Sequence, residues 1–244
     1  MIILPRTYAT VPFYDRYDGV IAVSDALYKI LLNVKLIDKT RLHCVYDILN
    51  EDLIRKQAIE KFGGEIPNKS VITLTTVARL IASNKGQDMC LEAAKILKDK
   101  GYKFQWFFVG DGPSRQELKA SAISLGIENE ARFVGMQPNP YPYIKAADIY
   151  VQSSRFEGFG LTITEAKILG RAIVCTNFPT AFNQLEDGKN GIIVEMTAES
   201  IASGIEKLLK DESLRQQLMN ATTKEVNTTA MTESKKVMDI IING

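Results

Sequence analysis

The sequence predicts an α/β protein built on a doubly wound parallel sheet, and three observations favour this class. Short apolar runs alternate with longer segments of helical periodicity from residue 71 onward. Several of the helical segments have about ten residues or more, the length that a crossover between parallel strands needs. Glycine-rich loops follow several of the apolar runs. Ligands bind to such sheets beyond the carboxyl ends of the strands, so a site is expected in these loops.

The first elements precede this alternation. An apolar run at 19–23 predicts a strand, and Ser24 is a suitable cap for a helix over 25–33. A second apolar run, at 42–46, predicts another strand. Together these elements predict a short βαβ unit ahead of the main sheet.

The main alternation follows a helix that is expected at 49–62. We expect strands at 71–77, 104–109, 131–134, 148–151 and 172–175, and a further strand at Ile192. The helices between them are expected at 87–98, 114–125, 143–146 and 161–169. Strands that are apolar along their whole length are typical of a sheet that helices cover on both faces.

The last part of the chain predicts amphipathic helices at 201–209 and 214–226. Their apolar stripe consists of Ile205, Leu208, Leu209, Leu214 and Leu218. The run Thr228-Thr229-Ala230 interrupts this pattern, so we expect a break there and a separate final helix over 233–242.

Composition excludes several classes of protein. The chain has 244 residues, of which 45% are hydrophobic, so it can bury a core. Thirty basic residues against 29 acidic residues leave a net charge of +1, which gives no global attraction to nucleic acid or to an anionic membrane. No apolar run reaches the roughly 18 residues that a membrane-spanning helix needs. We expect a soluble protein with at most peripheral membrane contact.

Cysteine and histidine usage argues against a disulfide or a metal site. Cys44, Cys90 and Cys175 lie in apolar elements and share no CxxC spacing. Buried, reduced thiols are therefore expected, and they indicate a reducing, cytoplasmic setting. His43, the only histidine, lies within an expected strand, where a partly buried structural role is favoured over a catalytic one. No D-x-D follows a strand, so no metal ligand is predicted.

The most informative stretch, residues 153–170, places chemistry at the start of a helix. The loop before the helix holds Glu157 and two glycines, Gly158 and Gly160. Unsatisfied amides at a helix start bind phosphate, and glycines let the backbone approach a ligand closely. Glu165 lies about one turn inside the helix, where its carboxylate and that of Glu157 can face the same pocket. Carboxylates there suit a ligand that carries hydroxyl groups beside its phosphates.

This stretch resembles the E-x7-E signature of retaining glycosyltransferases of family 4, in the class with two Rossmann-like domains. The similarity extends over residues 14–226 and is densest from 71 to 194. It looks most like enzymes that build bacterial capsular and other surface polysaccharides. The implied fold is the Rossmann-like donor-binding half of such an enzyme, with a short βαβ remnant of the N-terminal domain.

The resemblance also implies that the chain is divided into three parts. Residues 1–48 correspond to a remnant of the N-terminal acceptor-binding domain and the linker. Residues 49–226 correspond to the nucleotide-sugar-binding domain, and residues 227–244 to a C-terminal helix that packs back on the N-terminal domain.

Roles for the motif residues follow from the resemblance. Glu165 matches the residue that holds the ribose hydroxyls of the donor, and Glu157 matches the one that touches the transferred sugar. The donor-binding loop consists of Gly158, Phe159, Gly160, Leu161 and Thr162, with the amides of the last four on the distal phosphate. The alternative for either glutamate is an exposed acid without a ligand.

Arg79 and Lys85 follow the strand expected at 71–77. By resemblance they neutralise the donor's diphosphate and assist its departure, which makes them, with Glu157, the expected catalytic residues. On the residues alone, two solvated loop cations are the alternative.

Two further loops are expected at the same edge of the sheet. Gly110 begins a G-x-G-P turn, and because Arg115 stands where a dinucleotide fingerprint needs glycine, NAD binding is excluded. The resemblance implies that Gly110 lines the donor site and that the backbone around Met136 holds the edge of the base. Tyr141 and Tyr143 either stack on a base or pack against the short helix.

Together these features imply retaining transfer of a hexose from a UDP-sugar or GDP-sugar to a glycan or lipid-linked acceptor, without cofactor or metal. The departing diphosphate oxygen is the expected base. Two other functions stay open at this point. One is a truncated or split-enzyme subunit that binds the nucleotide sugar and needs a separate acceptor-domain polypeptide for transfer. The other is a nucleotide-sensing regulatory protein. Nucleic acid is not an expected partner.

Overall fold

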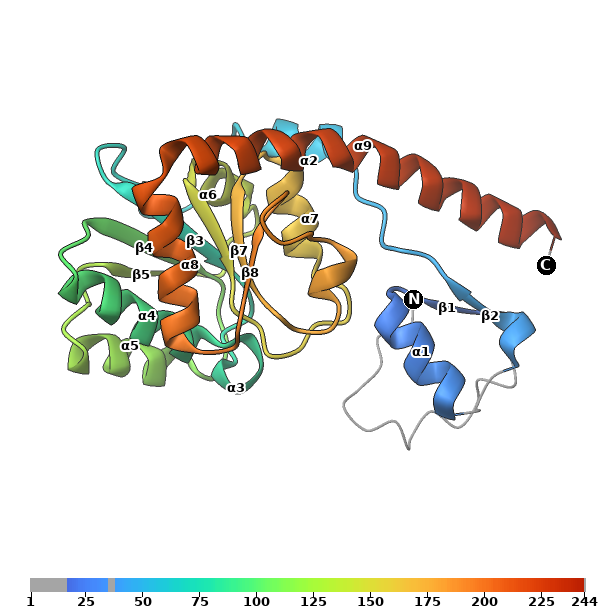
Figure 1. Ribbon diagram of the computed structural model, residues 1–244, viewed down its shortest axis with the longest axis horizontal. Helices are drawn as coiled ribbons and strands as arrows, with labels where there is room; N and C mark the ends of the chain where they lie inside the picture. The colour runs from blue at the N-terminus through green and yellow to red at the C-terminus, as the bar shows by residue number, and fades with distance from the viewer. Residues whose placement is uncertain (1–16, 35–37, 244) are drawn as a thin grey trace.

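Six parallel strands form the main sheet of the computed structural model, which describes residues 17–34 and 38–243 (Figure 1). The strands are β3 (Ile72–Val77), β4 (Phe104–Val109), β5 (Ala131–Gly135), β6 (Ile149–Gln152), β7 (Ala172–Thr176) and β8 (Ile192–Val194). Their order across the sheet is β5-β4-β3-β6-β7-β8, which grows outward from the neighbours β3 and β6. The predicted doubly wound parallel sheet is confirmed.

Helices cover both faces of this sheet (Figure 1). One face carries α4 (Gln87–Asp99), α5 (Arg115–Ser124) and α8 (Ala198–Lys210), and the other carries α2 (Glu51–Gln57), α6 (Tyr141–Ala146) and α7 (Leu161–Ile168). Alternate strand residues point to opposite faces. In β6, Ile149 and Val151 join the apolar cluster with α4 and α8, whereas Tyr150 joins the cluster with α7. Because both faces are buried, the strands are mostly apolar, and the polar residues within β3 and β4, such as Thr75 and Gln105, are themselves buried.

The strand order reverses between β3 and β6. The chain continues from β3 to its neighbour β4 on one side, and from β6 to its neighbour β7 on the other. The loops that follow two such strands lead away from each other, which leaves room for a ligand between them. These are the loops that carry Arg79, Lys85 and Glu157.

The N-terminal segment forms a small sheet of its own (Figure 1). β1 (Val20–Ala22) pairs in parallel with β2 (Leu42–Cys44), and α1 (Asp25–Val34) lies between them in the sequence. The predicted cap is confirmed, because Ser24 Oγ accepts a hydrogen bond from Leu27 N at 3.2 Å. The expected βαβ unit is therefore present.

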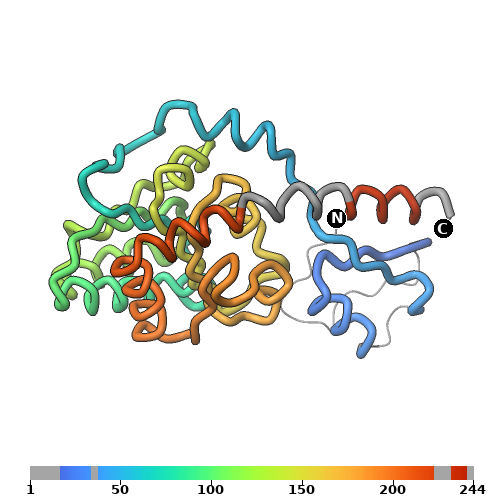
Figure 2. Tube along the Cα trace, turned by 45° about the horizontal axis from the view of Figure 1, so that its top comes forward, coloured from blue at the N-terminus to red at the C-terminus, as the bar shows by residue number. Residues whose placement is uncertain are grey.

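A single long helix, α9 (Glu212–Asn243), follows α8, so the predicted break at Thr228-Thr229-Ala230 is wrong. Threonine costs a helix only about 0.7 kcal/mol or less relative to alanine, and the run contains neither glycine nor proline. The helix passes from the main sheet back over the N-terminal segment (Figures 1 and 2). There the Glu233 carboxylate accepts a hydrogen bond from Tyr46 N at 2.8 Å, and Lys236 Nζ lies 5.5 Å from the centre of the Tyr46 ring.

The helix predicted at 49–62 is shorter in the structure. Asn50 starts α2 by accepting a hydrogen bond from Leu53 N at 3.0 Å. The helix ends at Gln57, and Ile59 just beyond it is 72% exposed. Most of the stability of a helix in a protein comes from packing of its apolar face, and Ile59 lacks such packing.

All three cysteines are free thiols. Cys90 and Cys175 are buried and Cys44 is half-buried, so the prediction of buried thiols holds for two of the three. Burial raises the pKa of Cys90 to about 12. Among the described helices, none has both the length and the apolar character needed to cross a membrane.

Candidate functional site

Two loops meet at the carboxyl edge of the main sheet. The loop after β3 contains a four-residue helix, α3 (Ala82–Lys85), which ends with Lys85. Gly86 follows in the left-handed conformation, with φ of 68°. This short helix was not predicted, because four residues are too few to show periodicity. The loop after β6 carries Glu157 directly before α7.

The two loops are hydrogen-bonded to each other. Ser153 Oγ donates to Lys85 O at 2.8 Å, and Arg155 N donates to Asn84 O at 2.8 Å. The backbones are so close that a Cβ atom on Gly86 would lie 2.0 Å from Ser153 O. Only glycine fits here, and it lets α3 lie directly against the loop after β6.

Lys85 and Glu157 form an ion pair. Lys85 Nζ lies 2.7 Å from both carboxylate oxygens of Glu157. Only 20% of the lysine side chain and 11% of the glutamate side chain are exposed. Glu157 Oε1 also accepts hydrogen bonds from Gln152 Nε2 at 2.9 Å and from Ser154 Oγ at 2.6 Å. The fold thus brings together two candidate residues that are 72 positions apart.

α7 begins directly after this loop. Gly160 has φ of 91° at the N-cap, and among the described residues no side chain caps the helix. The amides of Leu161 and Thr162 therefore keep the partial positive charge that attracts an anion. Gly158 is exposed, and an added Cβ atom there would meet nothing within 4 Å.

Only the backbone of Phe159 is available to a ligand at this loop, because its ring is buried. The ring is 6% exposed and stacks on Tyr46 with 5.2 Å between the ring centres. Gln184, which follows β7, donates from Nε2 to the carbonyl oxygens of Phe159 and Gly160. These bonds hold the glycine-containing loop in place from a third segment of the chain.

Glu165 lies one turn inside α7 and accepts a hydrogen bond from Tyr141 Oη at 3.3 Å. Burial raises the pKa of Glu165, and the bond from Tyr141 opposes that rise. The pKa of Tyr150 is raised chiefly by burial, and the charges of Glu165 and Glu157 add to the rise. Both carboxylates thus lie within electrostatic reach of the same buried ring.

Glu165→Gln is expected to stabilise the fold. The raised pKa means that the folded state binds this proton more tightly than the unfolded state does, so stability falls as pH rises from about 4.5 through the folded pKa. Glutamine is uncharged and escapes this loss. In urea unfolding, the variant should have the higher midpoint at about pH 8, and the difference should vanish near pH 4. The exposed acid Glu92 provides the control, because Glu92→Gln should leave both midpoints unchanged. A variant with the wild-type midpoint at both pH values would contradict the expectation.

The other candidate residues lie in loops at the same edge. Arg79 is exposed, and its guanidinium has no partner among the described residues, while its carbonyl oxygen accepts from Gln87 Nε2 at 3.0 Å. Gly110 has φ of 142°, and an added Cβ atom would lie 2.0 Å from Ala78 O. This glycine therefore lets the loop that carries Arg79 lie against the end of β4. Met136 follows β5 and is 78% exposed.

The tyrosines have different roles. Tyr143 lies within the short helix α6, is fully buried, and packs edge-on against Phe62 with 4.9 Å between ring centres. It is therefore a core residue, and base stacking is wrong for it. Tyr141 instead bonds to Glu165, a contact that was not predicted. His43 lies on β2 in the small sheet. Within the described parts of the chain, no three His, Cys, Asp or Glu side chains gather closely enough to hold a metal ion.

Besides Ser154 and Gln184, two more side chains of this region were missed by the sequence predictions. Gln152 is 2% exposed and bonds to Glu157. Arg155 donates to both carboxylate oxygens of Asp88, at 2.8 and 2.7 Å, and to Ala82 O at 2.7 Å, so it ties the loop after β6 to α3 and α4. For Gln152 the available signal was a polar residue at the end of an apolar run, shortly before the E-x7-E stretch.

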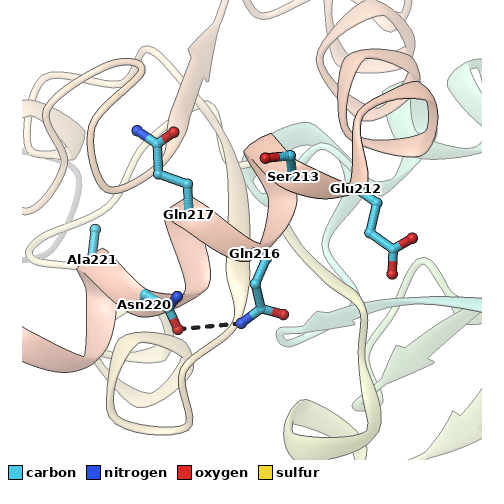
Figure 3. Close-up of a pocket in the computed structure, with 6 residues that line it drawn as sticks. All are labelled: Glu212, Ser213, Gln216, Gln217, Asn220 and Ala221. Atoms are coloured by element: carbon cyan, nitrogen blue, oxygen red, sulfur yellow. Dashed lines mark hydrogen bonds between the residues drawn. The ribbon is translucent and has the colours of Figure 1, made fainter.

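A surface hollow lies on the first turns of α9 (Figure 3). It has a volume of about 700 Å³ and is lined by Glu212, Ser213, Gln216, Gln217, Asn220 and Ala221. Gln216 Nε2 donates to Asn220 Oδ1 at 3.2 Å across one turn of the helix. No candidate site residue lines this hollow, so it does not belong to the site.

Comparison with known proteins identifies relatives of this chain. The family model of the glycosyl transferases group 1 matches residues 57–225. LpsE of Rhizobium meliloti, a lipopolysaccharide core biosynthesis glycosyltransferase, is 35% identical over 113 residues, which are 46% of this chain and 33% of LpsE. CapM of Staphylococcus aureus, a capsular polysaccharide biosynthesis glycosyltransferase, is 28% identical over 148 residues, which are 60% of this chain and 39% of CapM. The chain thus spans less than half the length of either relative.

The fold has relatives among solved structures. A mutant of TarM from S. aureus, in complex with UDP, fondaparinux and alpha-GlcNAc-glycerol, is similar with a TM-score of 0.81 and 17% identity, over 94% of this chain and 45% of TarM. At this identity the likeness shows the fold alone. The family match, by contrast, extends over more than half of the sequence and includes all six strands of the main sheet and both loops of the candidate site. This chain belongs to the glycosyl transferases group 1 family.

Proposed function

We propose that this chain is the donor-binding half of a retaining glycosyltransferase of family 4 in bacterial surface polysaccharide synthesis. It takes part in the transfer of a hexose from a UDP-sugar or GDP-sugar to a glycan or lipid-linked acceptor, in the cytoplasm at the inner face of the membrane, without a metal or cofactor. The functions of LpsE and CapM support the polysaccharide pathway, and the UDP bound to TarM supports a nucleotide donor.

The observation that carries the proposal is the contact between Lys85 and Glu157. A cation from the loop after β3 and a carboxylate at the start of α7 meet where the strand order reverses. A nucleotide sugar needs both, because its diphosphate requires positive charge and its sugar hydroxyls require acceptors. A simple phosphate site would have no use for the carboxylate.

The same contact suggests how the donor is bound. The diphosphate binds Arg79, Lys85 and the first amides of α7. Its oxygens compete with Glu157 for Lys85 Nζ, and the carboxylate released in this way accepts a hydrogen bond from the transferred sugar. Glu165 accepts hydrogen bonds from the ribose hydroxyls.

The transfer step needs no further protein base. The bond between the anomeric carbon and the diphosphate oxygen breaks, and Arg79 and Lys85 stabilise the charge that develops on that oxygen. The acceptor hydroxyl oxygen forms the new bond on the same face of the sugar, and its proton passes to the departing diphosphate. Configuration at the anomeric carbon is therefore retained.

The purified chain is expected to bind either UDP or GDP with a micromolar dissociation constant in the absence of divalent metal. Arg79→Ala and Glu165→Ala should each weaken this binding about tenfold or more, because each removes hydrogen bonds between a charged side chain and the ligand. Calorimetric titration measures both effects, and the nucleotide that binds identifies the base.

Arg55→Ala is the control for this experiment. Arg55 lies on the surface of α2, where its side chain is 41% exposed and pairs with Glu51 at 3.5 Å. Its loss should leave nucleotide binding unchanged. Absence of binding at millimolar UDP and GDP, or equal losses in all three variants, contradicts the proposed donor site.

A further inference from the structure

Gln152 lies beneath the candidate site and is bonded at every polar atom of its side chain. It ends β6 and is 2% exposed. Its Oε1 accepts from Tyr150 Oη at 3.0 Å and from Thr162 Oγ1 at 2.9 Å. Its Nε2 donates to Ser154 Oγ and to Glu157 Oε1, both at 2.9 Å. An amide has two donor hydrogens and one oxygen with two lone pairs, so these four bonds satisfy it completely.

The orientation of this amide follows from its partners. The Glu157 carboxylate can only accept, so the NH2 group must face it and the amide oxygen must face the two hydroxyls. One of those hydroxyls belongs to Thr162, in the first turn of α7. A single buried side chain therefore fixes the distance between the Glu157 carboxylate and the amides at the start of α7.

We propose that Gln152 is a positioning residue that holds Glu157 for the transferred sugar and so sets how strongly the site prefers a nucleotide sugar to the free nucleoside diphosphate. This inference rests on the proposed function. Glu157 is expected to contact the sugar, whereas the diphosphate is held mainly by Arg79, Lys85 and the backbone. Displacement of Glu157 therefore weakens binding of the nucleotide sugar more than binding of the nucleoside diphosphate.

Gln152→Met tests the proposal, because methionine has a similar length and makes none of the four hydrogen bonds. Titration calorimetry on the full chain gives dissociation constants for UDP and UDP-glucose, and for GDP and GDP-mannose. For the base that binds, the preference for the nucleotide sugar should fall about tenfold in Gln152→Met and in Glu157→Gln. The double variant should be no worse than Glu157→Gln alone, because both changes remove the same interaction.

A matched control comes from a second buried glutamine. Gln105 on β4 is 8% exposed and bonds to Asn68 and Thr73, near the opposite end of its strand from the site loops. Gln105→Met makes the same chemical change in the core. It should lower the urea midpoint and leave the preference for the nucleotide sugar unchanged.

A second variant keeps the test valid if Gln152→Met does not fold. Gln152→Glu has nearly the same shape and still accepts from Tyr150 and Thr162. It cannot donate to Ser154 or Glu157, and its carboxylate also repels that of Glu157, which displaces Glu157 from its position. The same fall in preference is expected from it.

Three results would overturn the positioning role. The first is an unchanged preference in a folded Gln152 variant, and the second is additive losses in the double variant; both leave the proposed function standing if the wild type binds a nucleotide sugar. The third is a wild-type chain that binds neither nucleotide nor nucleotide sugar, in which case the proposed function fails as well. Binding by the wild type therefore separates the two kinds of failure.

Discussion

Gly86→Ala is expected to separate the loops after β3 and β6 and to lower the affinity for UDP or GDP by at least about a hundredfold. The backbone φ of 68° at Gly86 disfavours any residue with a Cβ atom. The added atom would also lie 2.0 Å from Ser153 O, which is backbone and has no rotamer to change. Strain and overlap together should lower the free energy of unfolding by about 3 kcal/mol. The resulting shift of α3 carries Lys85 away from Glu157.

Gly101→Ala isolates the effect of the overlap. Gly101 has φ of 84°, and an added Cβ atom would have no neighbour within 4 Å, so the substitution shares the strain and lacks the collision. It should cost about 1 kcal/mol in urea unfolding and leave nucleotide affinity unchanged. If the two alanine variants bind nucleotide equally well, the close contact at Ser153 is not what holds the site together.

Lys85→Met is expected to lower the free energy of unfolding by about 3 kcal/mol, because it leaves a buried carboxylate without its counter-charge. The Glu157 side chain is only 11% exposed, and its other partners, Gln152 and Ser154, are neutral. Adding Glu157→Gln should recover part of this loss, since a neutral amide needs no cation. Urea unfolding of the wild type, the two single variants and the double variant gives the coupling free energy of the pair.

Lys95→Met is the control for the buried pair. Lys95 pairs with Asp99 on the surface of α4, where the two side chains are 38% and 59% exposed, so its loss should cost less than about 1 kcal/mol. The expectation fails if Lys85→Met costs no more than this control. It also fails if the double variant is no more stable than Lys85→Met.

The main sheet was predictable because the composition of its strands is enough to distinguish them from the segments around them. β4 matches the predicted 104–109 residue for residue, and all of its residues are buried. A strand that helices cover on both faces has few polar positions to interrupt its apolar run. The edge at which the candidate residues gather follows from the same fact, because parallel strands all end at one side of the sheet.

The partners within the site were less predictable, because they depend on which strands become neighbours. The sequence indicates that Lys85 and Glu157 each follow a strand, but their contact spans 72 positions and requires β3 to lie beside β6. The strand predicted at 148–151 ends before Gln152, a polar residue, whereas β6 includes it. Its burial depends on four hydrogen-bond partners, among them Tyr150 and Thr162, that only the folded chain assembles.

The break predicted within α9 shows, in another way, that local hydrophobic periodicity does not always predict where a helix ends. The run Thr228-Thr229-Ala230 interrupts an apolar stripe, yet the helix continues through it. Periodicity reports which side of a helix is buried, and it is lost wherever a helix leaves one packing surface for another. α9 does this, since it contacts α7 and β7 first and Tyr46 near its other end.

The bond from Tyr46 N to Glu233 also affects the order of events during synthesis of the chain. It joins residues that are 187 positions apart, and the bond from Asn183 Nδ2 to Asp25 Oδ2 spans 158. A ribosome that adds about 5–20 residues per second needs roughly 10 to 40 seconds to bridge the longer interval. The β1–β2 sheet therefore leaves the ribosome before the main sheet, and its hydrogen bonds to Asn183 and to α9 form only after those residues have been synthesised.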